Sequence, residues 1–522
     1  MDRRTFAKLT GLGTVGLSLS ACGSLPVFNP KTENMGFVDN IIVGSGYGGA
    51  VTALRLTENG HKTLLLEMGM RWDRTPEHDT FSKMITPDKR SSWLSNWPHS
   101  PITIPIPIKK YTGVLDKVKY DEMDVFTGRA YGGGSIVNGA IAITPKRKYF
   151  ESIFPELDAD KMFNHYFPLA NKELKVSQIP EDFYNETKYY EFSRSAEKQA
   201  HKANLKTEFF SNSYDFDYMR KEANGEVYKS GLGGEVIYGN NAGKFSLDFT
   251  YLKKAEETGN LEVKTLRKVE KISQAEDGKY ILEVAVLNTS GKTTAIEIYQ
   301  TNKVFLNAGS LGTSEILMKA KHLGDLPNLN DEIGQTWGPN GNIMTGRNFV
   351  KATGLSQSTI PVKGINMWDD DYPYQIFAEI APLPLGIETW TTLFLSITNN
   401  PERGKFVFDK NSGKVTLDWK RSQNEYAVEA AKYLLEKLKI DNGGTRSRLL
   451  FNNGFGDDFC YHPLGGCVLG KATDFYGRVK GYKGLYVNDS SLIPGSAGVN
   501  PYVFITGLAE HNMDEVIKKD FD

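Results

Sequence analysis

The alternation of apolar and polar positions is most regular near the start of the chain. An apolar run at residues 40–43 leads into a glycine-rich turn at residues 44–49, and apolar residues then recur at helical spacing over residues 50–60. A second apolar run at residues 63–66 ends in Glu67. This order of strand, turn, helix and strand predicts a βαβ unit of a parallel sheet.

The turn has the spacing G-x-G-x-x-G, formed by Gly44, Gly46 and Gly49. In such a turn the first glycine permits a tight bend, the second lets the backbone approach a pyrophosphate, and the third lets the helix pack close to the strand. The positive N-terminal end of the helix then faces the phosphates. Glu67 follows 18 residues after Gly49, where an acid can accept a hydrogen bond from a ribose hydroxyl. The stretch predicts a dinucleotide site and leaves both NAD and FAD open.

The apolar pattern returns to this unit further along the chain. Residues 303–310 predict another strand and turn with a helix from Thr313, residues 484–489 a further strand, and residues 501–518 a closing helix. Other strands are expected at residues 261–266, 280–286, 293–299, 377–380, 391–397, 405–409 and 414–419, and helices at residues 193–203 and 426–438. We expect the last four strands to form an antiparallel sheet over a binding site. The fold class is therefore α/β (α+β, two-domain): a Rossmann-like dinucleotide-binding domain and a substrate domain with an antiparallel β-sheet and helices, both made of discontinuous segments.

Two irregular stretches are candidates for contacts with a bound molecule. Residues 101–108 are an apolar loop interrupted by prolines, which suits either a lid or a structural surface loop. Residues 132–134 are three consecutive glycines, followed by Asn138 and Gly139. This cluster favours a close approach of the backbone to a bound group, with a structural bend as the alternative.

Residues 1–36 predict a targeting segment and a tether. Arg3 and Arg4 begin a pattern that resembles a bacterial twin-arginine signal, and the apolar run that follows, residues 9–21, is too short to span a bilayer. Residues 19–22 resemble a lipobox ending in Cys22. We therefore expect export by the twin-arginine route and a membrane-anchored lipoprotein, periplasmic or on the cell surface. A cytosolic leader with a chance cysteine is the alternative.

Composition limits the partners. The 522 residues include 62 basic and 63 acidic side chains, so no broad basic surface is expected and nucleic acid is not a predicted partner. Three cysteines, Cys22, Cys460 and Cys467, do not make a disulfide framework, and the pairing of the last two stays open. Cys460, Cys467 and His462 together offer three ligands, and a structural zinc site needs four, so no metal is expected. The oligomeric state stays open, with a monomer favoured.

Three motifs near the C-terminus carry a family resemblance. They are YHPLGGC at residues 461–467, GLYVND at residues 484–489 and PGSAGVNP at residues 494–501. With the glycine turn, they make the chain resemble the glucose-methanol-choline (GMC) oxidoreductases over roughly residues 38–518. Within that family it is most similar to the bacterial cholesterol oxidases that hold FAD non-covalently. The stretch LGIETW at residues 385–390 is shared with that branch and absent from other branches.

The resemblance implies an FAD-dependent oxidase of a 3β-hydroxysteroid. Such an enzyme uses O2, releases H2O2 and isomerises the Δ5 ketone to the conjugated Δ4 ketone. Its implied catalytic residues are Glu388, His462 and Asn500. A histidine with a pKa near neutrality suits proton transfer or orientation of the hydroxyl, and Glu388, among apolar neighbours, is expected to be buried with a raised pKa. Asn500 is expected to cap the last helix, whose positive end would stabilise the reduced flavin.

The resemblance also implies the cofactor contacts and the domain limits. Tyr502 stands where other members often have phenylalanine, which would change oxygen gating or polarity near the flavin. The expected FAD-binding residues are Gly44, Gly46, Tyr47, Gly48, Gly49, Glu67, Gly134, Asn138, Gly139, Val263, Asp489, Asn500 and Tyr502. The FAD-binding domain is assigned residues 37–70, 120–145, 230–330 and 456–522, and the substrate-binding domain residues 71–119, 146–229 and 331–455.

Two other functions compete with this one. A dehydrogenase could act on another bulky apolar alcohol and pass electrons to a quinone or a protein carrier. A tethered sterol- or flavin-binding protein without catalysis would have no need of Glu388, His462 and Asn500 together. The expected partners of the first function are the sterol, O2 and a membrane, contacted through substrate access and an anchor at Cys22.

Overall fold

A five-stranded parallel sheet forms the centre of one half of the molecule. In the computed structural model the described residues are 30–102, 104–348, 351–448, 450–451 and 454–521. The strand order is β22-β13-β2-β3-β9. The strands are β2 (Asn40–Val43), β3 (Thr63–Leu66), β9 (Leu261–Lys264), β13 (Lys303–Leu306) and β22 (Leu485–Val487), and all pair in parallel. The apolar residues of β2, β3, β13 and β22 are buried on both faces, as parallel strands require, and those of the edge strand β9 are half-buried.

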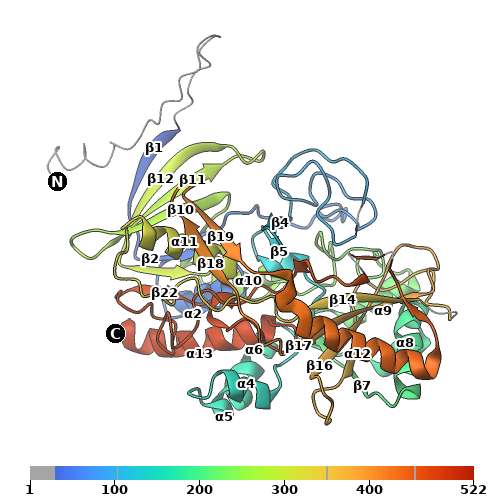
Figure 1. Ribbon diagram of the computed structural model, residues 1–522. Helices are drawn as coiled ribbons and strands as arrows, with labels where there is room; N and C mark the ends of the chain where they lie inside the picture. Colours follow the sequence, from blue (N-terminus) through green and yellow to red (C-terminus); the bar gives the residue numbers. More distant parts are fainter. Residues whose placement is uncertain (1–29, 103, 349–350, 449, 452–453, 522) are drawn as a thin grey trace, which may run out of the picture.

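Helices cover this sheet, and the predicted βαβ unit is confirmed. The helix α2 (Tyr47–Glu58) joins β2 to β3 and packs against α10 (Tyr251–Glu257) and α13 (Tyr502–Asp520). The helix α11 (Gly309–His322) follows β13, which confirms the second strand-turn-helix unit. Figure 1 shows α2 and α13 together below the parallel sheet.

A second sheet of four strands, in the order β1-β12-β11-β10, lies beside α11. It contains β1 (Lys31–Phe37), β10 (Arg267–Gln274), β11 (Tyr280–Leu287) and β12 (Thr293–Thr301). The prediction that residues 23–36 are a tether is wrong for residues 31–36, because β1 pairs in parallel with β12 as an exposed edge strand. The signal and lipobox patterns before it lie outside the described residues. Within the described part of the chain, no helix is long and apolar enough to cross a membrane.

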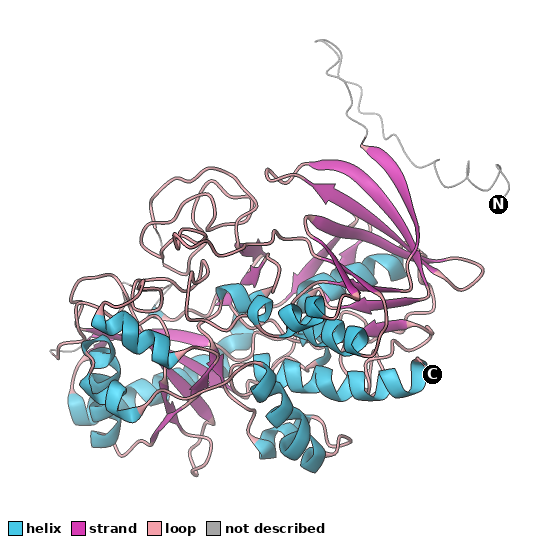
Figure 2. Cartoon of the chain, turned by 180° about the vertical axis from the view of Figure 1, so that it is seen from behind, coloured by secondary structure: helices cyan, strands magenta, loops and turns pink. Residues whose placement is uncertain are grey.

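A six-stranded antiparallel sheet organises the other half of the molecule (Figures 1 and 2). Its order is β20-β14-β17-β16-β15-β7. The strands are β7 (Thr207–Phe209), β14 (Ile343–Asn348), β15 (Lys363–Asn366), β16 (Ile376–Ala381), β17 (Thr391–Thr398) and β20 (Thr445–Arg446). The helices α8 (Glu191–Lys202) and α12 (Glu425–Asn442) pack against it. The predicted antiparallel sheet is thus confirmed for residues 377–380 and 391–397.

The strands predicted at residues 405–409 and 414–419 do not join this sheet. They form the separate hairpin of β18 (Lys405–Asp409) and β19 (Lys414–Asp418), which packs against α11. Its buried residues Phe406 and Leu417 stand opposite each other, and exposed residues alternate with them. Such alternation suits a hairpin with one face on the core. The prediction that both strands belong to the antiparallel sheet over the binding site is therefore wrong.

Short elements connect the two halves. The hairpin of β4 (Leu115–Lys119) and β5 (Asp124–Gly128) pairs with β21 (Phe459–Cys460), so the assigned domain limit at residue 120 falls inside it. The remaining described helices and bridging strands are α3 (Gly134–Val137), α4 (Arg147–Ile153), α5 (Ala159–Lys161), α6 (Phe167–Glu173), α7 (Glu181–Glu186), α9 (Phe216–Asn224), β6 (Ile141–Ala142) and β8 (Ser211–Asn212). Cys460 and Cys467 are both buried and free.

The start of α2 sits against the end of β22 because Gly48 has no side chain. A Cβ at this position would lie 1.5 Å from the backbone oxygen of Asn488, whereas a Cβ at Gly46 would meet nothing within 4 Å. We predict that Gly48→Ala lowers the free energy of unfolding by about 3 kcal/mol, because α2 must move off the sheet. Gly46→Ala, the control at the same turn, should leave the melting temperature of the apoprotein unchanged, and both variants are therefore compared without FAD. Thermal unfolding of both variants measures this, and equal melting temperatures would contradict it.

Candidate active site

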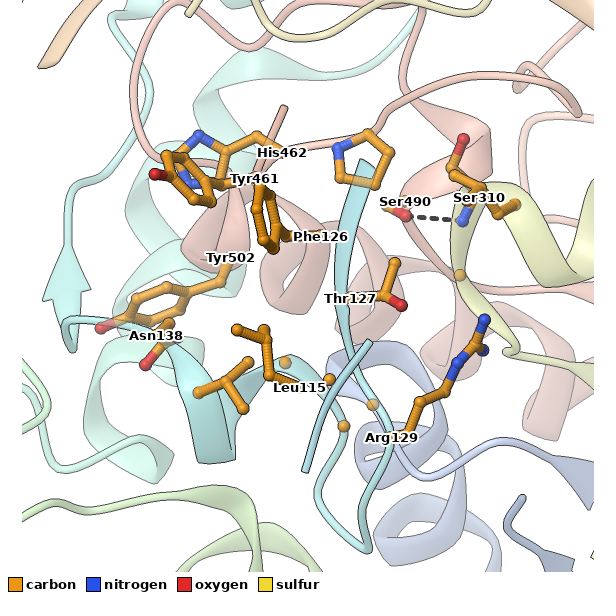
Figure 3. A pocket seen from close by; sticks show the side chains of 18 of the residues that line it. Leu115, Phe126, Thr127, Arg129, Asn138, Ser310, Tyr461, His462, Ser490 and Tyr502 are labelled. Atoms are coloured by element: carbon orange, nitrogen blue, oxygen red, sulfur yellow. Dashed lines mark hydrogen bonds between the residues drawn. The ribbon is translucent and has the colours of Figure 1, made fainter. Parts of the chain in front are cut away.

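A cavity of about 510 Å³ lies where the two halves meet. One wall consists of the loops that follow β2, β3, β13 and β22, and the other includes the inner faces of β14, β16 and β17. Carboxyl ends of parallel strands meet at one edge of a sheet, so loops from distant parts of the chain converge there. Figure 3 shows part of the lining, including His462, Asn138 and Tyr502.

The glycine cradle fits a dinucleotide. A Cβ at Gly46 or at Gly134 would meet no protein atom within 4 Å, and both residues line the cavity. Gly44 is different, because its φ of 96° and a Cβ position 2.4 Å from the oxygen of Asn307 are demands of the turn itself. Glycine at positions 46 and 134 therefore leaves room for a ligand close to the backbone.

Two long helices point uncapped N-termini at the cavity. No side chain caps α2 or α13, whose first residues Tyr47 and Tyr502 line the cavity. The free N–H groups and positive ends of these helices suit the negative charge of a pyrophosphate and of a reduced flavin. The prediction that Asn500 caps α13 is wrong, because Pro501 is the N-cap residue and no side chain bonds to the first turn.

By contrast, α11 is capped by the chain itself. One carboxylate oxygen of Asp489 accepts hydrogen bonds from Gly309 N (2.9 Å) and Thr313 Oγ1 (2.5 Å). Ser310 N donates to Ser490 Oγ at 3.0 Å, the bond drawn in Figure 3. Asp489 lines the cavity, and burial raises the pKa of its carboxyl. Asp489 therefore fixes the loop after β22 to the start of α11.

Glu67 stands rigidly at the end of β3. Its Oε2 accepts from Ser45 N (3.0 Å) and Ser45 Oγ (2.6 Å), and its Oε1 accepts from Gly69 N (2.7 Å). Burial raises the pKa of this carboxyl, and these bonds oppose the rise. Glu67 lines the cavity beside the glycine turn, so a ribose hydroxyl at this edge would meet a carboxylate that is already oriented.

The structure does not bring all the expected cofactor residues to the cavity. Gly48, Asn138, Gly139 and Asn500 line it together with those named above. Gly49 instead packs against the backbone of Gly44, and Val263 lies in β9 opposite Leu65. Val269 of β10 lines the cavity in place of Val263. Both valines stand in strands after the same helix, and sequence alone did not show which strand reaches the cavity.

His462 is half-buried, neutral and held by two asparagines. Its Nδ1 lies 2.8 Å from Asn342 Nδ2 and 3.5 Å from Asn340 Nδ2. With Nδ1 accepting from Asn342, the neutral ring carries its proton on Nε2. Burial lowers the pKa of His462 to about 4, so the ring stays uncharged at neutral pH. His462 is therefore a hydrogen-bond donor toward the cavity.

Glu379 is the acid that the antiparallel sheet contributes to the cavity, and the sequence analysis missed it. It is 5% exposed in β16 and lines the cavity with His462 and Asn500. Burial raises the pKa of Glu379 to about 8, although a hydrogen bond with Asn500 opposes the rise. Among the described residues, Glu379 Oε2 and Asn500 Oδ1 have no hydrogen-bond partner. Both residues line the cavity, so a ligand bound there could supply the missing hydrogen-bond partners. The available signal was an acid inside the apolar run 376–381, where every position is buried.

Glu388 lies elsewhere, and its expected environment was wrong. It does not line the cavity, and its neighbours Ile387 and Trp390 are 60% and 53% exposed. Its carboxylate accepts from Thr353 N and Oγ1, from Gly354 N and from Trp390 N, at 2.6 to 3.0 Å. Partial burial raises its pKa, but these bonds outweigh burial and hold the pKa of Glu388 below its usual value. Glu388 ties two loops together.

The site combines these groups with apolar walls. A neutral imidazole donor, an amide and a carboxyl with a pKa of about 8 face one space. The apolar lining near them includes Met344, Leu383, Leu393, Leu395 and Phe451. Such a site can orient a hydroxyl group and exchange protons with it, while a dinucleotide on the glycine cradle accepts a hydride.

Comparisons with known proteins agree with this geometry. Residues 38–336 and 404–509 match the GMC oxidoreductases, and residues 340–452 match the GMC oxidoreductase C-terminal part. A cholesterol oxidase of Acinetobacter baumannii is 25% identical, covering 92% of this chain and 94% of its own. A cholesterol oxidase of Mycobacterium tuberculosis (strain CDC 1551 / Oshkosh) is 23% identical, covering 90% of each.

Two solved structures share the fold. A pyridoxine 4-oxidase from Mesorbium loti has a TM-score of 0.62 at 15% identity and covers 91% of this chain and 98% of its own. A fungal aryl-alcohol oxidase has a TM-score of 0.65 at 13% identity and covers 93% of this chain and 99% of its own. The two-domain fold is thus that of an FAD-binding and a substrate-binding domain. The chain belongs to the GMC oxidoreductase family, whose members are flavoproteins that use FAD.

Proposed function

We propose that the protein oxidises a 3β-hydroxysteroid with O2, releases H2O2 and isomerises the Δ5 ketone to the Δ4 ketone. The observation that carries this proposal is the buried carboxyl of Glu379, whose Oε2 has no hydrogen-bond partner, in the same apolar cavity as the Nε2–H donor of His462. Oxidation of an alcohol needs only a hydride acceptor and one proton acceptor. A carboxyl with a pKa near the working pH can also take a proton from carbon and give it back.

FAD, His462 and Glu379 each have a separate role in the proposed reaction. FAD, when bound, supplies the hydride acceptor and passes two electrons to oxygen. His462 donates its Nε2–H to the substrate oxygen and orients it, and Asn342 keeps the ring in that tautomer. Glu379 in its carboxylate form accepts the hydroxyl proton and releases it to solvent. The same carboxylate then moves a proton from C4 to C6 of the ketone, which conjugates the double bond. Asn500 lines the cavity with Glu379 and lowers the pKa of its carboxyl, which favours the carboxylate form.

We also propose that the chain is exported by the twin-arginine route and anchored by a lipid. A lipid bilayer would then be the source of the substrate. Met84, Pro101 and Ile102 line the cavity, and Ile102 packs against Ala381, Leu383 and Leu393. The two loops that meet there expose Trp97 (57%) and Trp390 (53%). Exposed aromatic residues on loops that also contribute residues to an apolar cavity suit a membrane interface.

Vesicles test the bilayer proposal. The double variant Trp97→Ser and Trp390→Ser should lose several-fold activity on vesicle-bound sterol while keeping its activity on detergent-solubilised sterol. Leu323→Ser, which removes an exposed leucine at the end of α11, is the control and should behave like the wild type. An equal loss on both substrate forms in the double variant would contradict membrane docking.

Anaerobic mixing tests the oxidase reaction. FAD-loaded protein mixed with cholesterol without oxygen should lose its flavin absorbance, and admitting oxygen should restore it with formation of H2O2. Slow reoxidation would indicate the alternative, a dehydrogenase that uses a quinone or a protein carrier. No loss of absorbance would contradict both.

Acid denaturation followed by ultrafiltration should release all the flavin if FAD is bound non-covalently. The variant Gly46→Ala places a methyl group where the cofactor would approach the backbone. It should therefore fail to retain FAD under conditions in which the wild type retains it.

Glu379 should control the isomerisation and its pH dependence. We predict that Glu379→Gln slows isomerisation of added Δ5 ketone about 100-fold or more, because it removes the carboxylate that moves the proton. Because burial raises the pKa of Glu379 to about 8, the carboxylate is the minor form at pH 7. The wild-type rate should therefore rise about tenfold per pH unit up to about pH 8 and then level off.

Glu388→Gln is the control for this prediction. It should lower the melting temperature, since the amide keeps only one acceptor oxygen and cannot accept from both Thr353 Oγ1 and Gly354 N, and leave the product unchanged. Chromatography of the two ketones separates the outcomes. If Glu388→Gln stops isomerisation and Glu379→Gln does not, the assignment is wrong.

A further inference from the structure

The strained turn at residues 138–141 forms part of the cavity wall. Ala140 has a φ of 61°, in the left-handed region that residues other than glycine rarely adopt. Asn138, Gly139 and Ile141 on either side of it line the cavity. A conformation of this kind persists only when surrounding contacts hold it. The contacts that hold this turn therefore decide where Asn138 and Ile141 stand.

Two stacked tyrosines form hydrogen bonds with the turn, one with Asn138 and the other with Ala140. The rings of Tyr47 and Tyr502 lie 4.8 Å apart and are nearly parallel, at 8°. Asn138 Nδ2 donates to the hydroxyl of Tyr47 at 2.5 Å, and Asn138 Oδ1 accepts from Ala140 N at 3.1 Å. The hydroxyl of Tyr502 donates to the carbonyl of Ala140 at 3.0 Å. Each tyrosine is the first residue of a long helix, so the pair connects the turn to α2 and α13.

The Tyr502 hydroxyl also reaches the substrate half of the molecule. Ser213 Oγ lies 3.0 Å from it, and Ser213 N donates to the same Ala140 carbonyl at 2.8 Å. Ser213 follows β8, which pairs with β6 directly after the turn. One phenol oxygen thus links a helix of the cofactor half, the strained turn and a strand of the substrate half.

The other carbonyls of this segment are held from a different side. Buried Lys244 donates to the carbonyls of Ile136 (2.7 Å) and Asn138 (2.9 Å). Lys244 does not bond to the carbonyl of Ala140, which among the described residues accepts hydrogen bonds from Ser213 N and the Tyr502 hydroxyl. The contribution of one hydrogen bond and the strain of one left-handed residue are similar in size, so losing the phenol bond can release the turn.

We propose that Tyr502 is a positioning residue whose hydroxyl fixes the turn at residues 138–141 and so places Asn138 and Ile141 in the cavity wall. This inference rests on the proposed function only for its kinetic readout. The ring of Tyr502 supplies the stacking on Tyr47, and the hydroxyl supplies the positioning. Removing the hydroxyl should therefore loosen substrate binding and change the surroundings of the flavin while FAD stays bound.

Tyr502→Phe in the FAD-loaded protein tests the hydroxyl alone. We expect KM for the sterol to rise about three- to tenfold with kcat changed less than about twofold, since one hydrogen bond to a carbonyl is lost. The visible circular dichroism of the bound flavin should also change. Ser213→Ala, which leaves the Tyr502–Ala140 bond in place, should cause a smaller change in the same direction.

Tyr280→Phe is the matched control, because Tyr280 is a buried tyrosine whose hydroxyl donates to the carbonyl of Lys483 (2.8 Å) and does not line the cavity. It should lower the melting temperature and leave KM and the dichroism unchanged. Wild-type KM and dichroism in Tyr502→Phe, or the same KM change in Tyr280→Phe, would overturn the proposal. The dichroism needs no substrate, so a wild type inactive on sterols would contradict the proposed function and still leave this inference decided.

Discussion

The parallel pairing of β2 with β13, and of β13 with β22, is the constraint on which the rest of the structure depends. It brings three loops, from residues far apart in the chain, to one edge of one sheet. The absence of a side chain at Gly48 lets α2 start against the end of β22, within contact of Asn488. The same edge then carries the glycine cradle, Glu67 and Asp489. A cofactor bound there is fixed in place before any group of the substrate half meets it.

Burial acts in opposite directions on the two groups that handle protons. It raises the pKa of Glu379 to about 8 and lowers that of His462 to about 4, because burial disfavours the charged form of each. At pH 7 both groups are therefore mainly neutral, whereas in water the carboxyl would be ionised and the imidazole about one quarter protonated. An apolar cavity can hold this pair without an unpaired charge. The carboxyl is nevertheless close enough to its pKa to act as a base, and the imidazole remains a donor. The antiparallel sheet that buries Glu379 thus sets the chemistry as well as the shape of the cavity.

The sequence allowed the cofactor half to be predicted because its signals are local. The spacing of Gly44, Gly46 and Gly49, the apolar runs and Glu67 all fall within one βαβ unit, and their placement follows from that unit. The positions of side chains in the substrate half could not be predicted in the same way, because they depend on which segments are covered by the rest of the fold. Glu379 and Glu388 are only nine residues apart, and both have apolar neighbours in sequence. Only the sheet shows that the neighbours of Glu388 are exposed. Likewise, nothing in the sequence shows that β1 pairs with β12, or that Val269 and not Val263 reaches the cavity.

The central claim is that the glycine cradle, His462 and Glu379 form one site around FAD and an apolar alcohol. A crystal structure of the FAD-loaded protein, soaked without oxygen with a steroid alcohol, tests it most directly. The account predicts the pyrophosphate against Gly46 and Gly134, the flavin beside Asn500, and the steroid oxygen within hydrogen-bond distance of His462 Nε2, with Glu379 facing the steroid A and B rings. A steroid bound next to Glu388, or a flavin outside this cavity, would contradict it.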